Sequence, residues 1–541
     1  MRQRFFKTGE HWVWFNAGAI AISLVMVLGL LCLIAFKGLE HFWPAQVVEF
    51  QVAKGGITQP VLGEVYDEKL PKGSSSELDK QLLIKTGNRD VYGLDFRWIN
   101  ASDIKKESVP DNVVVIERRE WGNFYGTLEQ LTIDGQLFSV TSEESLFNKL
   151  QERVAITNDI MTNIHKLEKG DIGSINYDLE ELRLDRRRLE LKGDNTPENL
   201  AAITAQENQL HKNFEDLQAQ LNELYQQADL DSVLVKTIEG KELTFKLSNV
   251  VRAYQPNHLT TWGKVSHYGE KVAEFILDEP REANTEGGVF PAIFGTVMMV
   301  LLMSIIVTPF GVVAAVYLHE YAKQGVFTRL IRIAVNNLAG VPSIVYGVFG
   351  LGFFVYFMGG SIDSLFYPEA KPAPTFGTPG LMWASITLAL LTLPVVIVST
   401  EEGLSRIPKS LREGSLALGA TKIETLWKTI LPMSSPAMMT GLILAIARAA
   451  GEVAPLMLVG VVKLAPTLPL DANAPFIHLE RKFMHLGFHI YDVGFQSPNV
   501  EAARPLVYAT ALILVAVIVL LNLSAIYIRN HLREKYRTME H

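Results

Sequence analysis

Six uncharged, apolar stretches constrain the fold of this 541-residue chain more than any other feature of its sequence. An α-helix needs about 20 apolar residues to cross roughly 30 Å of hydrocarbon while satisfying its own backbone hydrogen bonds. The stretches lie at 17–36, 289–318, 334–362, 376–400, 433–447 and 505–528. We therefore predict an all-α polytopic membrane protein with six transmembrane helices. The fifth is expected to continue past Arg448 and Glu452 to about Val461.

Basic residues indicate which ends of these helices face the cytoplasm. With six spans, both termini, the second-to-third loop and the fourth-to-fifth loop share one side of the membrane. Lys and Arg cluster in all four segments: Arg2, Arg4, Lys7; Lys323, Arg329, Arg332; Arg406, Lys409, Arg412, Lys422, Lys428; Arg529, Arg533, Lys535, Arg537. By the positive-inside rule, we expect both termini in the cytoplasm. No small-x-small cleavage site follows the first span, so an uncleaved anchor is favoured over a signal peptide.

The predicted spans divide the chain into four parts. Residues 1–36 hold the cytoplasmic N-terminus and the first transmembrane helix, and 37–288 form a soluble insert expected outside the cytoplasm. Residues 289–528 form the membrane core with five helices, and 529–541 form a basic cytoplasmic tail. The insert carries a net charge of −14 and the remainder +6, which agrees with this topology and disfavours nucleic-acid binding.

The insert has the sequence pattern of an α+β domain. Strand-like segments occur at 112–116, 130–140, 232–238 and 243–249, with Asp134-Gly135 as a two-residue hairpin turn. Between about 142 and 228 the apolar residues recur at helical spacing, and turn residues at Gly193-Asp194 predict a helical hairpin. Its role stays open between docking another protein and a purely structural one. Cys32, the single cysteine, lies in the first span, so the insert is expected to fold without disulfides.

A polar, basic loop at 401–432 separates the fourth and fifth spans. It reads REGSLALGAT from Arg412 and runs on to Leu431-Pro432, so that Glu413 is followed by Gly419 six residues later. This pattern resembles the signature loop of permease subunits in binding-protein-dependent ABC importers, which folds as a short helix and docks on the ATPase. The resemblance implies a coupling role for Glu413, Gly414, Ser415, Gly419, Ala420, Leu431 and Pro432. Gly419 suits a tight turn, and Pro432 favours a helix start. The alternative is an ordinary amphipathic loop between two helices.

Two opposite charges lie in the fifth span. Arg448 and Glu452 are four residues apart, which places them on one face of a helix. A charge near the bilayer centre costs roughly 2.5–3.5 kcal/mol, so such residues face a cavity or each other. One interpretation is a buried ion pair that joins helices. The other is an anion pathway, in which Arg448 offers paired donors to phosphate-like oxygens and Glu452 orients it or accepts a proton.

Three motifs in order, at 308–321, 337–351 and 448–456, resemble the phosphate-importer permease of the PstA type. The resemblance covers about 289–528 and implies the type I ABC importer permease fold in a bacterial inner membrane. It also implies a sister permease subunit, a cytoplasmic ATPase dimer, an extracytoplasmic phosphate-binding protein and inorganic phosphate as substrate. ATP and Mg²⁺ would be bound by the ATPase, so this chain is expected to bind no cofactor and to be a transport subunit, not an enzyme. The alternatives are a permease for another oxyanion or small solute, and a membrane-anchored sensor or scaffold.

Two further patterns are set aside. Residues 403–410 nearly match a phosphate-binding P-loop, but Pro408 replaces the second glycine. His485 and His489 are four residues apart with Asp492 nearby, a spacing that can bind zinc. Because no clear further ligand follows, we expect surface histidines and no metal.

Overall fold

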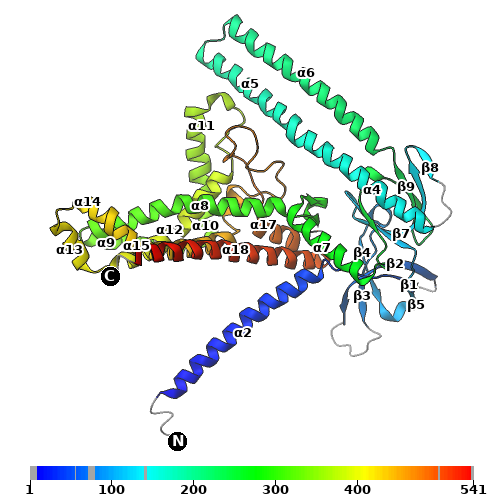
Figure 1. The fold of residues 1–541 in the computed structure, drawn as a ribbon, viewed down its shortest axis with the longest axis horizontal. Coiled ribbons are helices and arrows are strands. Elements are labelled where there is room, and N and C mark those ends of the chain that lie inside the picture. Colours follow the sequence, from blue (N-terminus) through cyan, green and yellow to red (C-terminus); the bar gives the residue numbers. More distant parts are fainter. Residues whose placement is uncertain (1–8, 55–56, 71–79, 139–142, 498–499, 538–541) are drawn as a thin grey trace.

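The computed structural model describes residues 9–54, 57–70, 80–138, 143–497 and 500–537. The basic residues Arg2, Arg4 and Lys7 lie outside this part. Long helices form one half of the molecule, and two β-sheets lie at one end of them (Figure 1). Helix α18 ends near the opposite end of the core, where the short helices α13 and α14 lie, and α2 extends away from the core (Figure 1). The sheets are formed by residues between β1 and β11, which lie between the first and second apolar helices in the sequence.

The prediction of six transmembrane helices is confirmed by length and composition. In the described part of the chain, six helices are long and apolar enough to cross a membrane: His11–Glu40, Phe290–Tyr321, Ser343–Phe366, Leu381–Ser405, Lys422–Gly451 and Ala503–His531. They belong to α2 (Glu10–Glu40), α8 (Phe290–Val316), α10 (Ser343–Phe349) with α11 (Gly360–Phe366), α12 (Leu381–Ser405), α14 (Lys422–Thr425) with α15 (Leu431–Gly451), and α18 (Val500–Arg537). π-helical segments extend α8 (Tyr317–Tyr321), join α10 to α11 (Gly350–Gly359) and join α14 to α15 (Leu426–Ile430).

Several span boundaries differ from the predicted ones, among them the start of the third span and the end of the fifth. The third span starts at Ser343 and not at 334, because 326–338 form a separate amphipathic helix, α9 (Val326–Leu338). Pro342 disfavours helical backbone at the residue before it, which separates α9 from α10. The fifth span ends at Gly451 and not near Val461, since Glu452 has extended backbone (φ −82°, ψ 130°). A short helix, α16 (Leu456–Val459), follows after Pro455.

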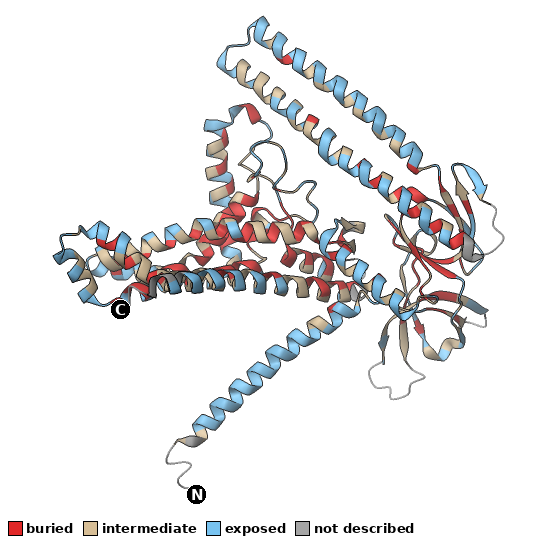
Figure 2. Ribbon diagram, in the orientation of Figure 1, coloured by how far each residue is buried: buried red, intermediate tan, exposed pale blue. Residues whose placement is uncertain are grey.

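Helix α12 forms the centre of the membrane core. Its most apolar window is 67% buried, against 28% or less in the other five spans, and its buried face is visible in Figure 2. Glycines let its neighbours approach closely: a Cβ added to Gly311 of α8 would lie 2.5 Å from Val396, and one on Gly441 of α15 would lie 2.6 Å from Ser399. Such small-residue contacts are how helices associate in a bilayer.

Helix α2 is exposed over most of its length (Figure 2). Its end meets α18, where a Cβ on Gly38 would lie 3.0 Å from the Tyr508 carbonyl oxygen. Apolar side chains such as Ile20 and Leu24 are 66% and 58% exposed. This surface is therefore suited to lipid or to another membrane chain.

The insert contains two antiparallel sheets. The first has the order β4-β3-β2-β1-β5, and the second has the order β10-β9-β7-β6-β11, with β8 paired to β7. Their strands are β1 (Val47–Lys54), β2 (Ile57–Lys69), β3 (Gln81–Lys85), β4 (Phe96–Asn100), β5 (Ile104–Ser108), β6 (Val113–Arg118), β7 (Asn123–Ile133), β8 (Gln136–Phe138), β9 (Ser232–Lys236), β10 (Glu242–Lys246) and β11 (Val250–Tyr254). Asp134 and Gly135, both with positive φ, form the expected turn between β7 and β8. Positions 139–140 of the predicted strand lie outside the described residues.

Short elements complete the structure. Between the sheets and the core lie α3 (Arg89–Tyr92), α7 (Thr261–Leu277) and the two-residue strands β12 (Pro280–Arg281) and β13 (Glu286–Gly287). Helix α17 (Leu486–Tyr491) precedes α18. Strands of the second sheet were predicted from the sequence, whereas the first sheet and α7 were not. Phe275 of α7 packs with Val289, Ala292 and Leu506, so α7 links the insert to the core.

A long helical hairpin projects from the second sheet (Figure 1). Helix α4 (Glu143–Lys166) continues through the π-helical segment Leu167–Ile172 into α5 (Gly173–Lys192), and α6 (Pro197–Ala228) returns beside it. The base of α4 packs on the sheet through Leu150, which is fully buried. Farther out, α5 contacts two loops of the core: Arg188 pairs with Glu369 at 2.8 Å, and the Tyr177 hydroxyl donates to the Ala474 carbonyl at 2.6 Å. The hairpin therefore bridges the sheet and the core.

Replacement of Leu150 by alanine is expected to destabilise the insert by roughly 2–5 kcal/mol, because it leaves a cavity between α4 and the second sheet. Hydrogen exchange of peptides from β6 and β9 should accelerate, while α12 stays protected. Leu191→Ala, at a side chain that is 51% exposed, is the matched control. Equal exchange in the two variants would contradict the packing described here.

Candidate functional site

The polar loop between the fourth and fifth spans folds into a short helix and a tight turn. Helix α13 (Lys409–Ala417) is followed by Gly419, whose φ of 88° is left-handed. The Gly419 amide donates to the Leu416 carbonyl at 3.0 Å, and the Ala420 amide donates to the Ser415 carbonyl at 3.2 Å. These bonds satisfy carbonyls at the end of the helix. Glycine is favoured at 419 by backbone conformation alone, since nothing lies within 4 Å of an added Cβ.

The fifth span begins directly after this turn. The Glu424 amide donates to Thr421 Oγ1 at 3.3 Å, and the Thr421 amide donates to Glu424 Oε2 at 2.9 Å, which forms a reciprocal capping box. Pro432 lies in the first turn of α15, but the continuous helix starts ten residues earlier, at α14. The Thr-x-x-Glu pattern that starts it was present in the sequence and was missed.

Arg412 fastens α13 to the membrane core. Its guanidinium donates to the Leu404 carbonyl at the end of α12 (2.7 Å) and pairs with Glu320 beyond α8 (3.0 Å). Lys422 donates to the Glu320 carbonyl at 3.1 Å, and the Ser415 and Thr425 hydroxyls are 2.9 Å apart. The short helix is thus tied to three spans. Sequence reasoning gave Arg412 no role of its own.

The outer side of this element presents polar and apolar side chains to solvent. Glu413, Gly414 and Gly419 are exposed, and Ser415, Ala420, Leu431 and Pro432 are half-buried. Four large apolar side chains are also exposed: Leu416 46%, Leu418 91%, Ile423 62% and Trp427 70%. Exposed apolar groups gathered on a short polar segment are typical of a protein contact surface.

Arg448 and Glu452 come together as the spacing predicted. Arg448 Nε lies 3.6 Å from Glu452 Oε1, with the side chains 32% and 22% exposed. Glu452 is the first residue beyond the helix and not part of it, because α15 ends at Gly451. Among the described residues, the Arg448 terminal nitrogens form no hydrogen bond. The pair belongs to one segment of the chain and does not itself join two helices.

One continuous helix connects the two groups of predicted site residues. Thr425, which holds α13, and Arg448 are 23 residues apart in the helix that runs from Lys422 to Gly451. At 1.5 Å per residue, the separation is roughly 35 Å. The structure therefore places the loop residues and the charged pair near opposite ends of the fifth span.

The two histidines set aside above are not at the surface. His485 and His489 are 1% and 3% exposed, because α17 packs against α8 and α18. His485 Nδ1 accepts from the Gly487 amide at 3.1 Å, and His489 Nδ1 lies 3.3 Å from Thr510 Oγ1. Burial lowers the pKa of both side chains to about 4, so they are neutral near pH 7. The described part of the chain has no cluster of three or more metal-ligating side chains.

Comparison with known proteins gives a consistent result. A family model described as "Binding-protein-dependent transport system inner membrane component" matches residues 307–538. The phosphate transport system permease protein PstA 1 of Mycobacterium tuberculosis (strain CDC 1551 / Oshkosh) is 34% identical over 245 residues, covering 45% of this chain and 71% of that protein. The probable ABC transporter permease protein YqgH of Bacillus subtilis is 33% identical over 207 residues, or 38% of this chain and 63% of that protein.

A further relative and one solved structure were also found. PstA of Mycobacterium leprae is 38% identical over 175 residues, so this chain spans 52% of that protein and less than two thirds of YqgH. The MetNI methionine ABC transporter in an inward-facing conformation is 19% identical, with a TM-score of 0.33 over 44% of this chain and 94% of that one. The family match begins within α8 and includes none of the insert.

Replacement of Gly419 by valine is expected to strain the turn by about 1–2 kcal/mol, because a β-branched residue is disfavoured at positive φ. Hydrogen exchange in peptides covering 409–425 should then accelerate roughly 5- to 30-fold. Gly193→Val places the same strain (φ 72°) at the exposed tip of the helical hairpin and should leave 409–425 unchanged. Wild-type protection in Gly419→Val would contradict the assigned turn.

Proposed function

Since the chain belongs to the inner membrane components of binding-protein-dependent transport systems, and to their PstA type, we propose that it is the permease subunit of an ATP-driven phosphate importer. Membership of this family makes it a transport component and not an enzyme. The observation that supports phosphate as the substrate is the environment of Arg448. Its guanidinium lies in the membrane core with one charged partner, Glu452, and 32% of its side chain is exposed.

The geometry around Arg448 suits an oxyanion. Glu452 lies beside Nε, and no described residue occupies the terminal nitrogens, so these planar donors are free for two oxygens of a phosphate. An ion pair that only locks helices together would connect different helices, whereas this pair lies within one segment. Glu452 would orient the guanidinium and compensate part of its charge before the anion arrives.

Coupling is proposed to run through α13. A cytoplasmic ATPase dimer would contact the exposed side chains Leu416 and Leu418. It would also contact Glu413, which lies between Arg412 and Ser415, the residues that tie α13 to the spans. That dimer would bind ATP and Mg²⁺ and supply the free energy of hydrolysis. Because Arg412 and the Ser415–Thr425 contact tie α13 to the spans, a movement of α13 would be carried along the fifth span toward Arg448.

The remaining partners follow from exposed surfaces and topology. A sister permease would cover part of the exposed apolar surface of α2 and α8 and complete the passage, and lipid would cover the rest. An extracytoplasmic phosphate-binding protein would deliver inorganic phosphate. The chain would lie in a bacterial inner membrane with both termini cytoplasmic and 37–288 periplasmic. A permease for another oxyanion shares this chemistry, whereas a sensor or scaffold would not need the α13 surface.

Arg448→Lys should lower phosphate uptake about tenfold or more per assembled complex, because lysine keeps the charge but loses the paired donors. A hydrogen bond to a charged group is worth roughly 1.5–3 kcal/mol. Arg406→Lys, at an exposed side chain on the loop, is the matched control. The measurement is radiolabelled phosphate uptake in vesicles, normalised to complex, with sulfate as competitor. Wild-type uptake per complex in Arg448→Lys and Arg448→Ala would exclude the pathway role, and competition by sulfate would favour another oxyanion.

The proposed orientation can be tested by cysteine labelling. In a Cys32→Ala background, Asn195→Cys at the hairpin tip should react with an impermeant maleimide added outside the inner membrane. Ser410→Cys on α13 should react only after the membrane is opened. Both positions are exposed, so accessibility of the side chain is matched. The reverse pattern would invert the topology.

A further inference from the structure

A cavity of about 380 Å³ lies where the insert meets the ends of α2 and α18. Its walls come from both sheets, from α7, from residues 281–287 and from Phe42 and Leu506 of the core. Ligand pockets typically have volumes of roughly 300–1,000 Å³. Arg448 and Glu452 are not among its lining residues, so this cavity is separate from the proposed phosphate pathway.

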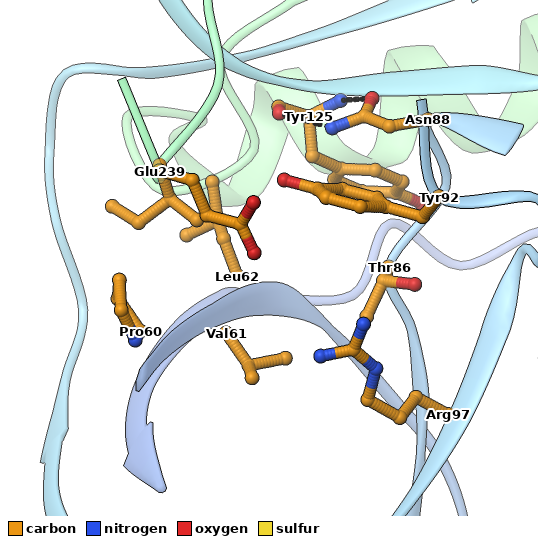
Figure 3. A pocket seen from close by; sticks show the side chains of 10 residues that line it. Pro60, Val61, Leu62, Thr86, Asn88, Tyr92, Arg97, Tyr125 and Glu239 are labelled. Carbon is orange, nitrogen blue, oxygen red and sulfur yellow. Dashed lines mark hydrogen bonds between the residues drawn. The ribbon is translucent and has the colours of Figure 1, made fainter. Parts of the chain in front are cut away.

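A second hollow in the insert is too small to hold a ligand. It lies between β2, β7 and residues 86–92, near Tyr92 and Tyr125. Figure 3 shows Asn88 hydrogen-bonded to the Tyr125 backbone at its rim. Its volume of about 10 Å³ accommodates about one water molecule. The larger cavity is therefore the one with room for a ligand.

One wall of the larger cavity is a preformed ionic network. Lys271 Nζ lies 2.6 Å from Glu117 and 3.3 Å from Glu274, and Arg281 and Arg252 contact Glu274 at 2.5 and 3.1 Å. Burial alone would raise the pKa of Glu274, but these three cations lower it to about 2. The network is thus ionised and fixed. Arg281 Nε is buried and has no hydrogen-bond partner.

Three other charged side chains line the same cavity, and in the described part of the chain none of them forms an ion pair within 4 Å. They are Lys85, Glu64 and Glu286, and Glu64 has the Tyr125 hydroxyl as a neighbouring hydrogen-bond donor. Glu64 and Lys85 face each other across the β2–β3 pair, so they lie on the same side of the sheet. All three are half-buried. Charges withdrawn from water cost free energy unless a partner compensates them.

A ligand that matches these three side chains must carry both a positive and a negative charge. An inorganic anion would pair with Lys85 but would place negative charge beside two carboxylates. A metal cation would pair with the carboxylates but would lie beside an ammonium group. Phe42, Phe96 and Phe275 add apolar surface to the same cavity. A small organic molecule with an ammonium group, a carboxylate and an apolar part satisfies all of these features.

We propose that the cavity binds a small zwitterion of the amino-acid type. Its ammonium group would pair with Glu64 and Glu286, its carboxylate with Lys85 and Arg281 Nε, and its side chain would lie against the phenylalanines. Because the walls include the ends of α2 and α18, the bound molecule would contact the insert and the membrane core together.

The test is isothermal titration of the full-length chain in nanodiscs with neutral, basic and acidic L-α-amino acids and with inorganic phosphate. At least one amino acid is expected to bind, and phosphate is expected not to bind this cavity. Lys85→Met and Glu64→Gln should each raise the dissociation constant tenfold or more. Lys106→Met and Glu107→Gln, exposed on neighbouring β5, are matched controls that should leave it unchanged.

Thermal melting of each ligand-free variant shows whether it folds. If Glu64→Gln does not fold, Glu286→Gln is used in its place. Binding of no amino acid would overturn the proposal. An unchanged dissociation constant for the amino acid in the folded cavity variants would overturn it too. A third contrary result is that phosphate binds, Lys85→Met abolishes this binding, and no amino acid binds. The titration needs only this chain, so its outcome is independent of whether the chain transports phosphate.

Discussion

The packing of α12 between α8 and α15 is the constraint on which the membrane core depends. Within a bilayer the hydrophobic effect does not drive helices together, so association relies on close contact between small residues. Gly311 and Gly441 supply that contact on opposite neighbours, where even one added carbon would overlap Val396 or Ser399. The hydroxyls of Ser385, Thr387 and Thr392 donate to carbonyls of their own helix, so these three buried groups are satisfied.

This central packing leaves the predicted site residues at the two ends of the fifth span. The fifth span lies against α12 along its length and carries the turn with Gly419 before its start and Arg448 near its finish. Both regions are partly open to their surroundings, whereas the helix between them is held by α12. The proposed coupling would therefore run through a helix that is held along its length by α12.

Features set by local sequence were predictable, and features set by distant contacts were not. The six spans follow from apolar length, and the turns at Gly419 and Asp134-Gly135 follow from residues that tolerate positive φ. Apolarity does not report helix breaks, so the interruption at Pro342 and the end of α15 at Gly451 were missed. The Arg412–Glu320 pair joins residues 92 positions apart, and the burial of His485 depends on α17 folding against α8. No local pattern signals either one. The roles of Arg448 and Glu452 stay a prediction.

The contacts of α5 with the core restrain the tilt of the helical hairpin relative to the membrane core. The helix is held near its start by Ser174 and Tyr177 and near its end by Arg188. Arg188 is 14 residues from Ser174 and 11 from Tyr177, and the longer of these separations is about 21 Å. A tilt of about 5° about the first contact would displace Arg188 by roughly 1.8 Å. The 2.8 Å ion pair with Glu369 would then have to lengthen or the Arg188 side chain would have to rearrange. The contacts at Ser174, Tyr177 and Arg188 together restrain the orientation of the helical hairpin relative to the membrane core.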